Sequence, residues 1–176
     1  MSFEMVRRSA KFAIDWADEF IAEPLVEPRK QQLGEFYHAI KCPLYHLPEG
    51  GTVEQGVFEV DRWLDHQREH GDVELAMRAS TIVSSGSSER IVAACLVNAC
   101  EPFEDDRTFL HLGASIQHIV VAPDFRRQDI ATKMIKRAMT IVADDRPRFD
   151  VWVEEDDEAE RNLFDKLDFV FTGVED

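Results

Sequence analysis

The stretch that decides the fold is Ile119-Val120-Val121-Ala122-Pro123-Asp124-Phe125-Arg126-Arg127-Gln128-Asp129-Ile130-Ala131. It begins as an apolar strand, passes through a short turn that carries Arg126 and Arg127, and then opens a helix. The unpaired backbone N–H groups at a helix start can form an anion site. Residues 126–137 hold five basic side chains and only Asp129 as an acid, whereas the whole chain has a net charge of −15. We therefore predict an anion-binding site at this helix start.

The composition predicts one globular domain. The chain has 176 residues, of which 44% are hydrophobic, enough to bury a sizeable core. A pI near 4.7 argues against nucleic acid and against an anionic membrane surface as partners, because both require many basic side chains. No apolar run is long enough for a membrane span, and the acidic N-terminal region is not typical of a signal peptide.

The cysteines indicate a reducing compartment. Cys42, Cys95 and Cys100 are odd in number and lack a CxxC spacing, so we expect neither a disulfide framework nor a structural metal site. Together with the missing signal peptide, this pattern predicts a cytoplasmic protein.

The periodicity divides the chain near residue 72. Helical spacing predicts helices over 10–21 and 33–40. A third helix is predicted after the N-cap Thr52, and Gly71 is expected to end it as the C′ residue. The start, residues 3–8, suits either a strand or a helix. Beyond Gly71 the pattern predicts strands at 75–84, 90–100, 108–121, 148–153 and 169–174, with helices at 128–143 and 157–167. We expect a single α/β (α+β) domain with a helical N-terminal region, 1–72, and a mixed-sheet core, 73–176.

Residues 75–174 resemble the GNAT superfamily of acyl-CoA-dependent N-acyltransferases. The family pattern Val-x-Pro-x-x-Arg followed by Arg/Gln-x-x-Gly-x-Gly/Ala is matched by the stretch from Val121 to Ala131. A second family element, a strand, an Asn-led turn, Leu-Tyr and Gly-Phe, is matched by 149–153, Asp157, Leu163-Phe164 and Asp168-Phe169. The resemblance implies a mixed, mostly antiparallel twisted sheet flanked by helices.

The resemblance also implies acetyl-CoA as co-substrate, no metal, and an acceptor that is a small-molecule amine or a peptide. In the family the strand before the turn splays from its neighbour, and its free backbone groups, here expected at Ile119 and Val121, pair with the pantetheine arm. The residues implied to bind the cofactor are Ile119, Val120, Val121, Arg126, Arg127, Gln128, Asp129, Ile130, Ala131, Asp157 and Phe164.

Two family glycines are aspartates in this chain. Asp129 replaces the glycine of the phosphate turn, so it adds a Cβ atom and a negative charge near an anion. Asp is also favoured in the first turn of a helix and can point to solvent, so weakened cofactor binding and tolerance both remain open. Asp168 replaces the glycine before the last strand, where a left-handed backbone is expected, and we interpret that change as structural.

The family's general base and general acid are also replaced. Gln117 stands where the family has a glutamate and cannot act as a base. The candidate catalytic residues are therefore His118, His111 and Glu104, since histidine has a suitable pKa. Phe164 stands where many family members have a tyrosine that acts as the general acid. The two tyrosines of this chain, Tyr37 and Tyr45, can reach the site only if the helical half folds over it.

Four further signals leave alternatives open. The sequence from His66 to His70 matches H-x-x-E-H, which is typical of a zinc peptidase, but helix-end histidines are equally explained by the helix dipole. The acidic run 154–160 suits either a cationic substrate or a solvated helix start. The missing acid and base allow a non-catalytic CoA-binding or partner-binding module. Many family members have one strand more, and an open sheet edge there would favour a homodimer.

Overall fold

The computed structural model describes residues 2–40, 51–86, 89–99, 113–154 and 157–175. The strands are β1 (Ser2–Arg8), β2 (Phe20–Pro24), β3 (Thr81–Ser85), β4 (Ile91–Asn98), β5 (Gly113–Val121), β6 (Arg148–Glu154) and β7 (Val170–Glu175). The helices are α1 (Lys30–Ala39), α2 (Val53–His70), α3 (Val73–Ala79), α4 (Ile130–Val142) and α5 (Glu158–Asp165), with short 3-10 turns η1 (Glu27–Arg29) and η2 (Pro123–Phe125). No helix in these ranges is long and apolar enough to cross a membrane.

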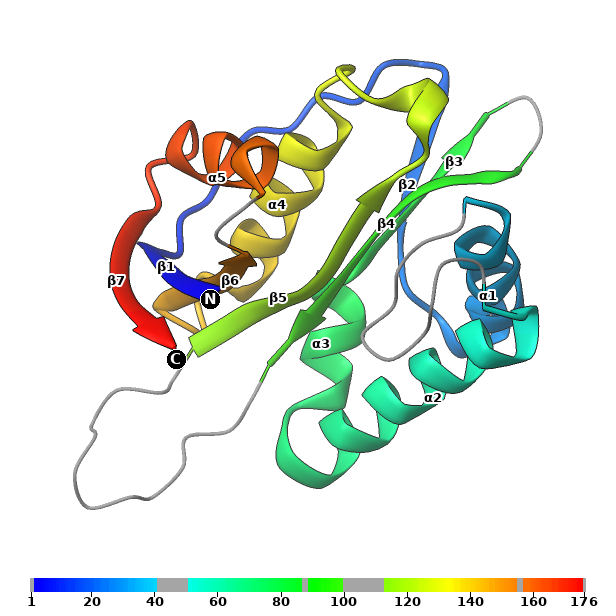
Figure 1. Ribbon diagram of the computed structural model, residues 1–176, viewed down its shortest axis with the longest axis horizontal. Helices are drawn as coiled ribbons and strands as arrows, with labels where there is room; N and C mark the ends of the chain where they lie inside the picture. The colour runs from blue at the N-terminus through cyan, green and yellow to red at the C-terminus, as the bar shows by residue number, and fades with distance from the viewer. Residues whose placement is uncertain (1, 41–50, 87–88, 100–112, 155–156, 176) are drawn as a thin grey trace.

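The strands form one seven-stranded sheet in the order β2-β3-β4-β5-β6-β1-β7. The β5–β6 pair is parallel and the other neighbouring pairs are antiparallel, which confirms the predicted mixed, mostly antiparallel sheet. The interior strand β4 is buried along its whole length, because α1, α3 and α4 all pack against it. Figure 1 shows α1 and α2 side by side at one half of the sheet and α5 beside the other.

The N-terminal strand lies inside the sheet. β1 pairs with β6 on one side and with β7 on the other, both antiparallel, so the ambiguous segment 3–8 is a strand. The last strand, β7, lies beyond β1 at the edge of the sheet (Figure 1).

The helix predicted over 10–21 is wrong. Residues 9–19 cross α4 without regular structure and lead into β2. Phe12 N donates to Thr140 Oγ1 at 3.0 Å, and the ammonium of Lys133 lies 5.8 Å from the centre of the Trp16 ring. From Lys11 to Ala17 every second residue is exposed. The apolar residues therefore alternate with a period of two, as in an extended segment. We had interpreted their spacing as that of a helix.

The region around Gly71 differs from the prediction in two ways. The segment predicted as a strand from residue 75 begins as helix α3, whose N-cap Asp72 accepts a hydrogen bond from Leu75 N at 2.9 Å. Gly71 caps α2 with an extended backbone, φ −153°, instead of the expected left-handed one. A Cβ atom there would lie 2.8 Å from the Ala99 carbonyl oxygen, so close chain packing explains the glycine.

Helix α2 starts as predicted, and it crosses α1 closely. Thr52 and Gln55 form a reciprocal capping box at its first turn. A Cβ atom on Gly34 of α1 would lie 2.6 Å from Val57 Cγ2, and one on Gly56 of α2 would lie 3.0 Å from Gly34 Cα. The two glycines let the helix backbones approach, and this fixes the side chains that α1 and α2 present to the sheet.

Candidate functional site

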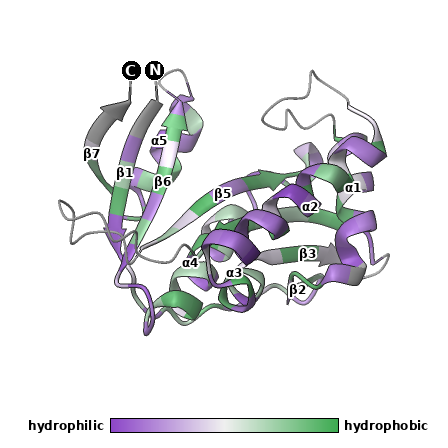
Figure 2. Cartoon of the chain, turned by 90° about the horizontal axis from the view of Figure 1, so that it is seen from below, coloured by the Kyte–Doolittle hydropathy of each residue, from purple (hydrophilic) through white to green (hydrophobic). Residues whose placement is uncertain are grey.

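Strand β5 has one open edge. It pairs with β4 along most of its length but with β6 only from Gly113 to Ser115. Figure 2 shows β5 and β6 diverging from that point. Ala122 N donates to Val92 O of β4 at 2.8 Å. Because an antiparallel ladder alternates, the backbone groups of Ile119 and Val121 face away from β4, into the opening.

The open edge leads directly into the predicted anion turn. Both Arg127 and Asp129 have φ 63°, the left-handed conformation that favours glycine. Asp129 is the N-cap of α4, yet its carboxylate makes no capping hydrogen bond. The first N–H groups of α4 are thus not occupied by their own cap, which is the arrangement that an anion requires.

The arginines of this turn are exposed to solvent. Arg126 Nε donates to the Val121 carbonyl at 3.2 Å, and Gln128 Nε2 donates to the Asp124 carbonyl at 3.4 Å. Ile130 is buried and anchors the helix start to the core. The side chains of Arg126 and Gln128 and the buried Ile130 therefore hold the turn, while both arginines lie at its surface, where a ligand can reach them.

A pocket of about 360 Å³ lies where α1 and α2 meet β4 and β5. It is lined by Tyr37, Glu59, Val60, Arg62, Trp63, His66, Leu96, Gln117 and His118. Gln117 and His118 both reach it because β5 has a bulge: Leu96 pairs with His118 and Val97 with Ile116, which leaves Gln117 as an extra residue. The bulge explains how two successive side chains line one pocket.

Burial controls the protonation of His118. Desolvation lowers the pKa of this imidazole to about 4, because burial disfavours the charged form. The ring packs edge-on against Tyr37 with 5.2 Å between centroids. His118 is therefore neutral at pH 7 and lies next to the hydroxyl-bearing ring of α1, so the helical half does fold over the strand and brings Tyr37 to it.

A chain of buried amides fixes Gln117. Asn98 Nδ2 donates to Gln117 Oε1 at 2.8 Å, and Asn98 Oδ1 accepts from Trp63 Nε1 at 2.9 Å and from Gln67 Nε2 at 3.0 Å. Gln67 Oε1 in turn accepts from Ala99 N at 2.9 Å. The network joins α2 to β4 and β5 and positions the pocket wall without supplying a base.

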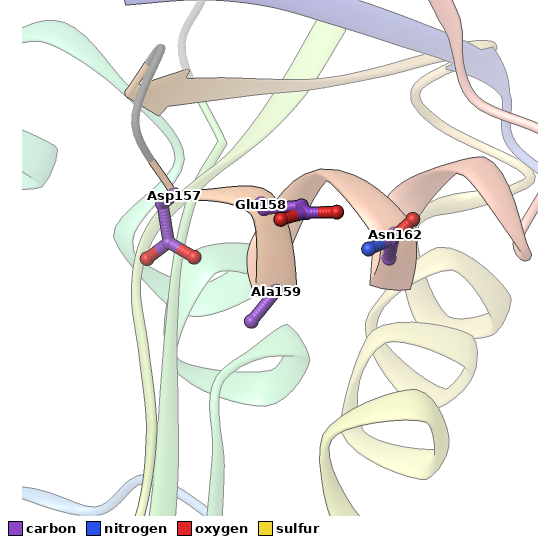
Figure 3. A pocket seen from close by; sticks show the side chains of 4 residues that line it. All are labelled: Asp157, Glu158, Ala159 and Asn162. Atoms are coloured by element: carbon purple, nitrogen blue, oxygen red, sulfur yellow. The ribbon is translucent and has the colours of Figure 1, made fainter.

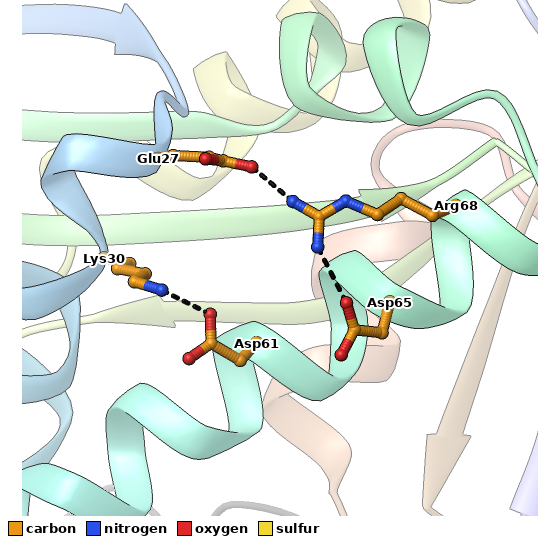
Figure 4. Close-up of polar contacts among 5 residues, drawn as sticks. All are labelled: Glu27, Lys30, Asp61, Asp65 and Arg68. Carbon is orange, nitrogen blue, oxygen red and sulfur yellow. Dashed lines mark hydrogen bonds and ion pairs between the residues drawn. The ribbon is translucent and has the colours of Figure 1, made fainter.

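Partly exposed ion pairs link α2 to α1 and to η1. Lys30 Nζ lies 2.7 Å from Asp61 Oδ1 and so links α1 to α2, and Arg68 binds both Glu27 and Asp65 (Figure 4). The rings of His66 and His70 lie with their centroids 5.1 Å apart and their planes tilted by 56°. Among the residues that the structure describes, no group of three or more His, Cys, Asp or Glu side chains could hold a metal.

The second family element runs from β6 through α5 to the start of β7. Asp157 caps this helix, with its Oδ1 accepting from Glu160 N at 2.8 Å, and it lines an open hollow of about 650 Å³ with Glu158, Ala159 and Asn162 (Figure 3). Burial, with Asp157 and Glu154 adding to it, raises the pKa of Glu160 to about 7. The hollow thus lies at the start of α5, beside a carboxyl group that is partly protonated at neutral pH.

Phe164 is fully buried and packs against Phe169 with 5.1 Å between ring centroids. It belongs to the core in this structure, so its predicted contact with the cofactor stays a prediction. Asp168 has φ 59°, as expected at this position, and Arg7 lies 3.5 Å from its carboxylate. The structure does not describe Glu104, His111 or Tyr45.

The pocket contains residues of α2 that we did not predict. Glu59 is three residues before Arg62 and four before Trp63, and His66 is four residues after Arg62 and three after Trp63, so the four side chains share one face of the helix. That spacing was visible in the sequence, but an amphipathic helix does not reveal which strand it covers.

Residues 53–169 match the model of the acetyltransferase (GNAT) family. A GCN5-related N-acetyltransferase from Sphaerobacter thermophilus has a similar fold, with a TM-score of 0.66, 17% identity, and coverage of 97% of this chain and 48% of that chain. This chain thus spans about half the length of that protein.

Two further structures are similar. One is AAC(6')-Iy in complex with the bisubstrate analogue CoA-S-monomethyl-acetylneamine, with a TM-score of 0.64, 11% identity, and coverage of 89% and 95%. The other is the NatC complex bound to Gag peptide and CoA, with a TM-score of 0.62, 15% identity, and coverage of 85% and 83%. A search of curated proteins found no match. The family model covers most of the chain, and the chain therefore belongs to the GNAT family of acetyltransferases.

Proposed function

We propose that the chain transfers an acetyl group from acetyl-CoA to an amine of a small molecule or peptide. The observation that carries this proposal is the continuity of β5: its open edge at Ile119 and Val121 runs into the turn at Arg126 and Arg127, and its bulge lines a pocket. An extended thioester, an anionic end and an acceptor thus each have a place along one strand.

The cofactor part of the proposal uses backbone groups. The pantetheine arm pairs with Ile119 and Val121 as an added strand would. The pyrophosphate binds at the start of α4, where Arg126 and Arg127 supply charge-assisted hydrogen bonds. The similar structures that contain CoA or a CoA-derived analogue support the use of an acyl-CoA.

The transfer step needs a proton acceptor and a proton donor. The neutral acceptor amine attacks the acetyl carbonyl carbon, the C–N bond forms and the C–S bond breaks. We assign the proton that the amine loses to His118, which is neutral at pH 7 and can accept it. Its pKa of about 4 makes this imidazole a weaker base than an ordinary histidine. We assign Tyr37, whose ring lies 5.2 Å from that of His118, as the donor to the departing CoA sulfur.

Calorimetric titration with acetyl-CoA tests the cofactor site. We expect saturable binding with a submillimolar dissociation constant, weakened in the Arg126→Met, Arg127→Met double variant. Arg146→Met, which lies beyond the end of α4, is the matched control and should bind as the wild type does. No binding at millimolar ligand would refute the proposal.

A catalytically inactive CoA-binding module is the second candidate. It is favoured by the amide at Gln117 and by the buried phenyl ring of Phe164, because neither can transfer a proton. Thiol release from acetyl-CoA with a panel of polyamines, aminoglycosides, amino acids and peptides separates the two candidates. Binding of acetyl-CoA with no acceptor-dependent thiol release would favour the module.

A cytoplasmic location and a homodimer belong to the same proposal. The buried thiol of Cys95 and the acidic composition are compatible with a reducing compartment. β7 is an edge strand on which Val170 and Phe171 are exposed, and a second chain there would cover both. Sedimentation analysis that shows only monomers at micromolar concentration would contradict the dimer.

A further inference from the structure

An ion pair lies in the wall of the β4–β5 pocket. Glu59 and Arg62 are one turn apart on α2, and Arg62 Nη2 lies 2.6 Å from Glu59 Oε2. Both line the pocket together with the apolar side chains of Val60, Trp63 and Leu96. The pocket therefore contains one negative and one positive group next to an apolar surface.

The two ions of this pair differ in exposure, because the side chain of Glu59 is mostly withdrawn from solvent whereas that of Arg62 is 46% exposed. Arg68 and Asp65 have the same spacing on the same helix, but the side chain of Asp65 is 66% exposed, whereas that of Glu59 is 13% exposed. A carboxylate withdrawn from water needs a compensating partner. Helix propensity alone does not explain why the acid of one pair is placed inside a pocket.

We propose that the acceptor is a small zwitterionic amine, such as a free amino acid, whose ammonium binds Glu59 and whose carboxylate binds Arg62. The ammonium loses one proton to solvent before the neutral amine attacks the acetyl carbonyl carbon. This inference rests on the proposed acetyl transfer. On binding, the pair exchanges one internal contact for two contacts with the ligand, so each ion keeps an oppositely charged partner.

The size and lining of the pocket support this class of acceptor. A volume of about 360 Å³ is at the small end of ligand pockets, and the apolar wall can receive an aliphatic or aromatic side chain. An acceptor that carries only positive charges would bind Glu59 but leave Arg62 facing a like charge. An anionic group beside the reacting amine is thus the feature that the pair selects.

The test compares each acceptor with a version that lacks the negative charge. Acetyl-CoA turnover is measured by thiol release with leucine, phenylalanine, lysine and glutamate as free acids, as α-carboxamides and as the decarboxylated amines. We expect kcat/KM for at least one free acid to exceed that of both of its matched forms by at least tenfold.

Variants connect this preference to the pocket. R62M should reduce kcat/KM for the preferred free acid at least tenfold and leave the decarboxylated amine within about threefold, so that the preference disappears. R68M removes the exposed pair of the same helix and should retain the preference. The melting temperature and acetyl-CoA affinity of each variant show whether the fold and the cofactor site are intact.

The outcomes separate this inference from the function on which it rests. Acetyl-CoA binding with acceptor-dependent thiol release, but equal or faster turnover of the amides and amines, would overturn the zwitterion assignment alone. Retention of the preference in R62M would do the same. Failure of every free acid while another amine is acetylated also counts against it, and absence of acetyl-CoA binding would overturn the proposed function and this inference together.

Discussion

Replacement of Asp129 by glycine should tighten acetyl-CoA binding with little change in stability. Asp129 has φ 63° at the N-cap of α4, and its carboxylate makes no capping hydrogen bond. A left-handed backbone costs an ordinary L-residue about 1–2 kcal/mol, and aspartate less. Glycine removes that cost, but it also makes the unfolded chain more flexible, and this offsets about 0.4–1 kcal/mol of the gain in stability. We therefore expect the free energy of unfolding to change by less than about 1 kcal/mol.

The effect on binding comes from charge. Two unit charges about 4 Å apart repel by about 1 kcal/mol in water and by about 4 kcal/mol at an effective dielectric of 20. Because Asp129 is exposed, the lower value applies, and salt reduces it further. A gain of about 1 kcal/mol corresponds to a roughly fivefold lower dissociation constant for acetyl-CoA.

Calorimetric titration of three variants checks this reasoning. Asp129→Asn keeps the Cβ atom and removes the charge, so it should show most of the gain of Asp129→Gly. Asp144→Asn removes a charge near the other end of α4, where Asp144 pairs with Lys11, and should bind as the wild type does. The gain should shrink as salt rises from 0.05 to about 0.5 M. Unchanged affinity in both Asp129 variants would refute the assignment of this turn to the phosphates, and a gain with glycine alone would indicate steric rather than electrostatic control.

Three more predictions concern buried groups. Since the unfolded His118 protonates near pH 6.5 and the folded one near pH 4, the wild type should lose up to about 3 kcal/mol of stability between those pH values, and His118→Gln should lose less in urea titrations. The folded pKa of Glu160 lies above its unfolded value, so the wild type loses stability as pH rises from about 4.5 to 7. Glu160→Gln should therefore have a higher melting temperature than the wild type at pH 8. An equal or lower melting temperature would contradict the burial of this carboxyl group. Gly34→Ala should destabilise the fold by about 1–3 kcal/mol in urea, because the new Cβ atom would lie 2.6 Å from Val57 Cγ2; a neutral result would mean that α1 and α2 do not cross this closely.

Local signals predicted the second half of the chain well. The start of α4 and the strand before it follow from an apolar run, a proline turn and a helical stripe, all within a few residues of one another. The cap of α2 was predicted correctly because a capping box is a local interaction between Thr52 and Gln55. Signals of this kind depend on neighbours in sequence and need no knowledge of the tertiary structure.

Features that depend on distant contacts were missed. The segment before β2 lies extended because Phe12 and Trp16 pack on α4, which is more than a hundred residues away in sequence. Gln117 enters the pocket because of a bulge against β4, and Glu59 enters it because α2 covers β5. Neither the bulge nor the packing of α2 leaves a pattern in the local sequence, so the candidate cofactor edge was predictable and most of the acceptor pocket was not.

A crystal structure obtained after soaking with acetyl-CoA tests the central proposal most directly. We predict density for the pyrophosphate at the turn from Arg126 to Ala131, with the pantetheine arm along the open edge of β5 at Ile119 and Val121, and with the acetyl group directed toward His118. Cofactor bound elsewhere, or an unoccupied β5 edge at millimolar acetyl-CoA, would contradict the account.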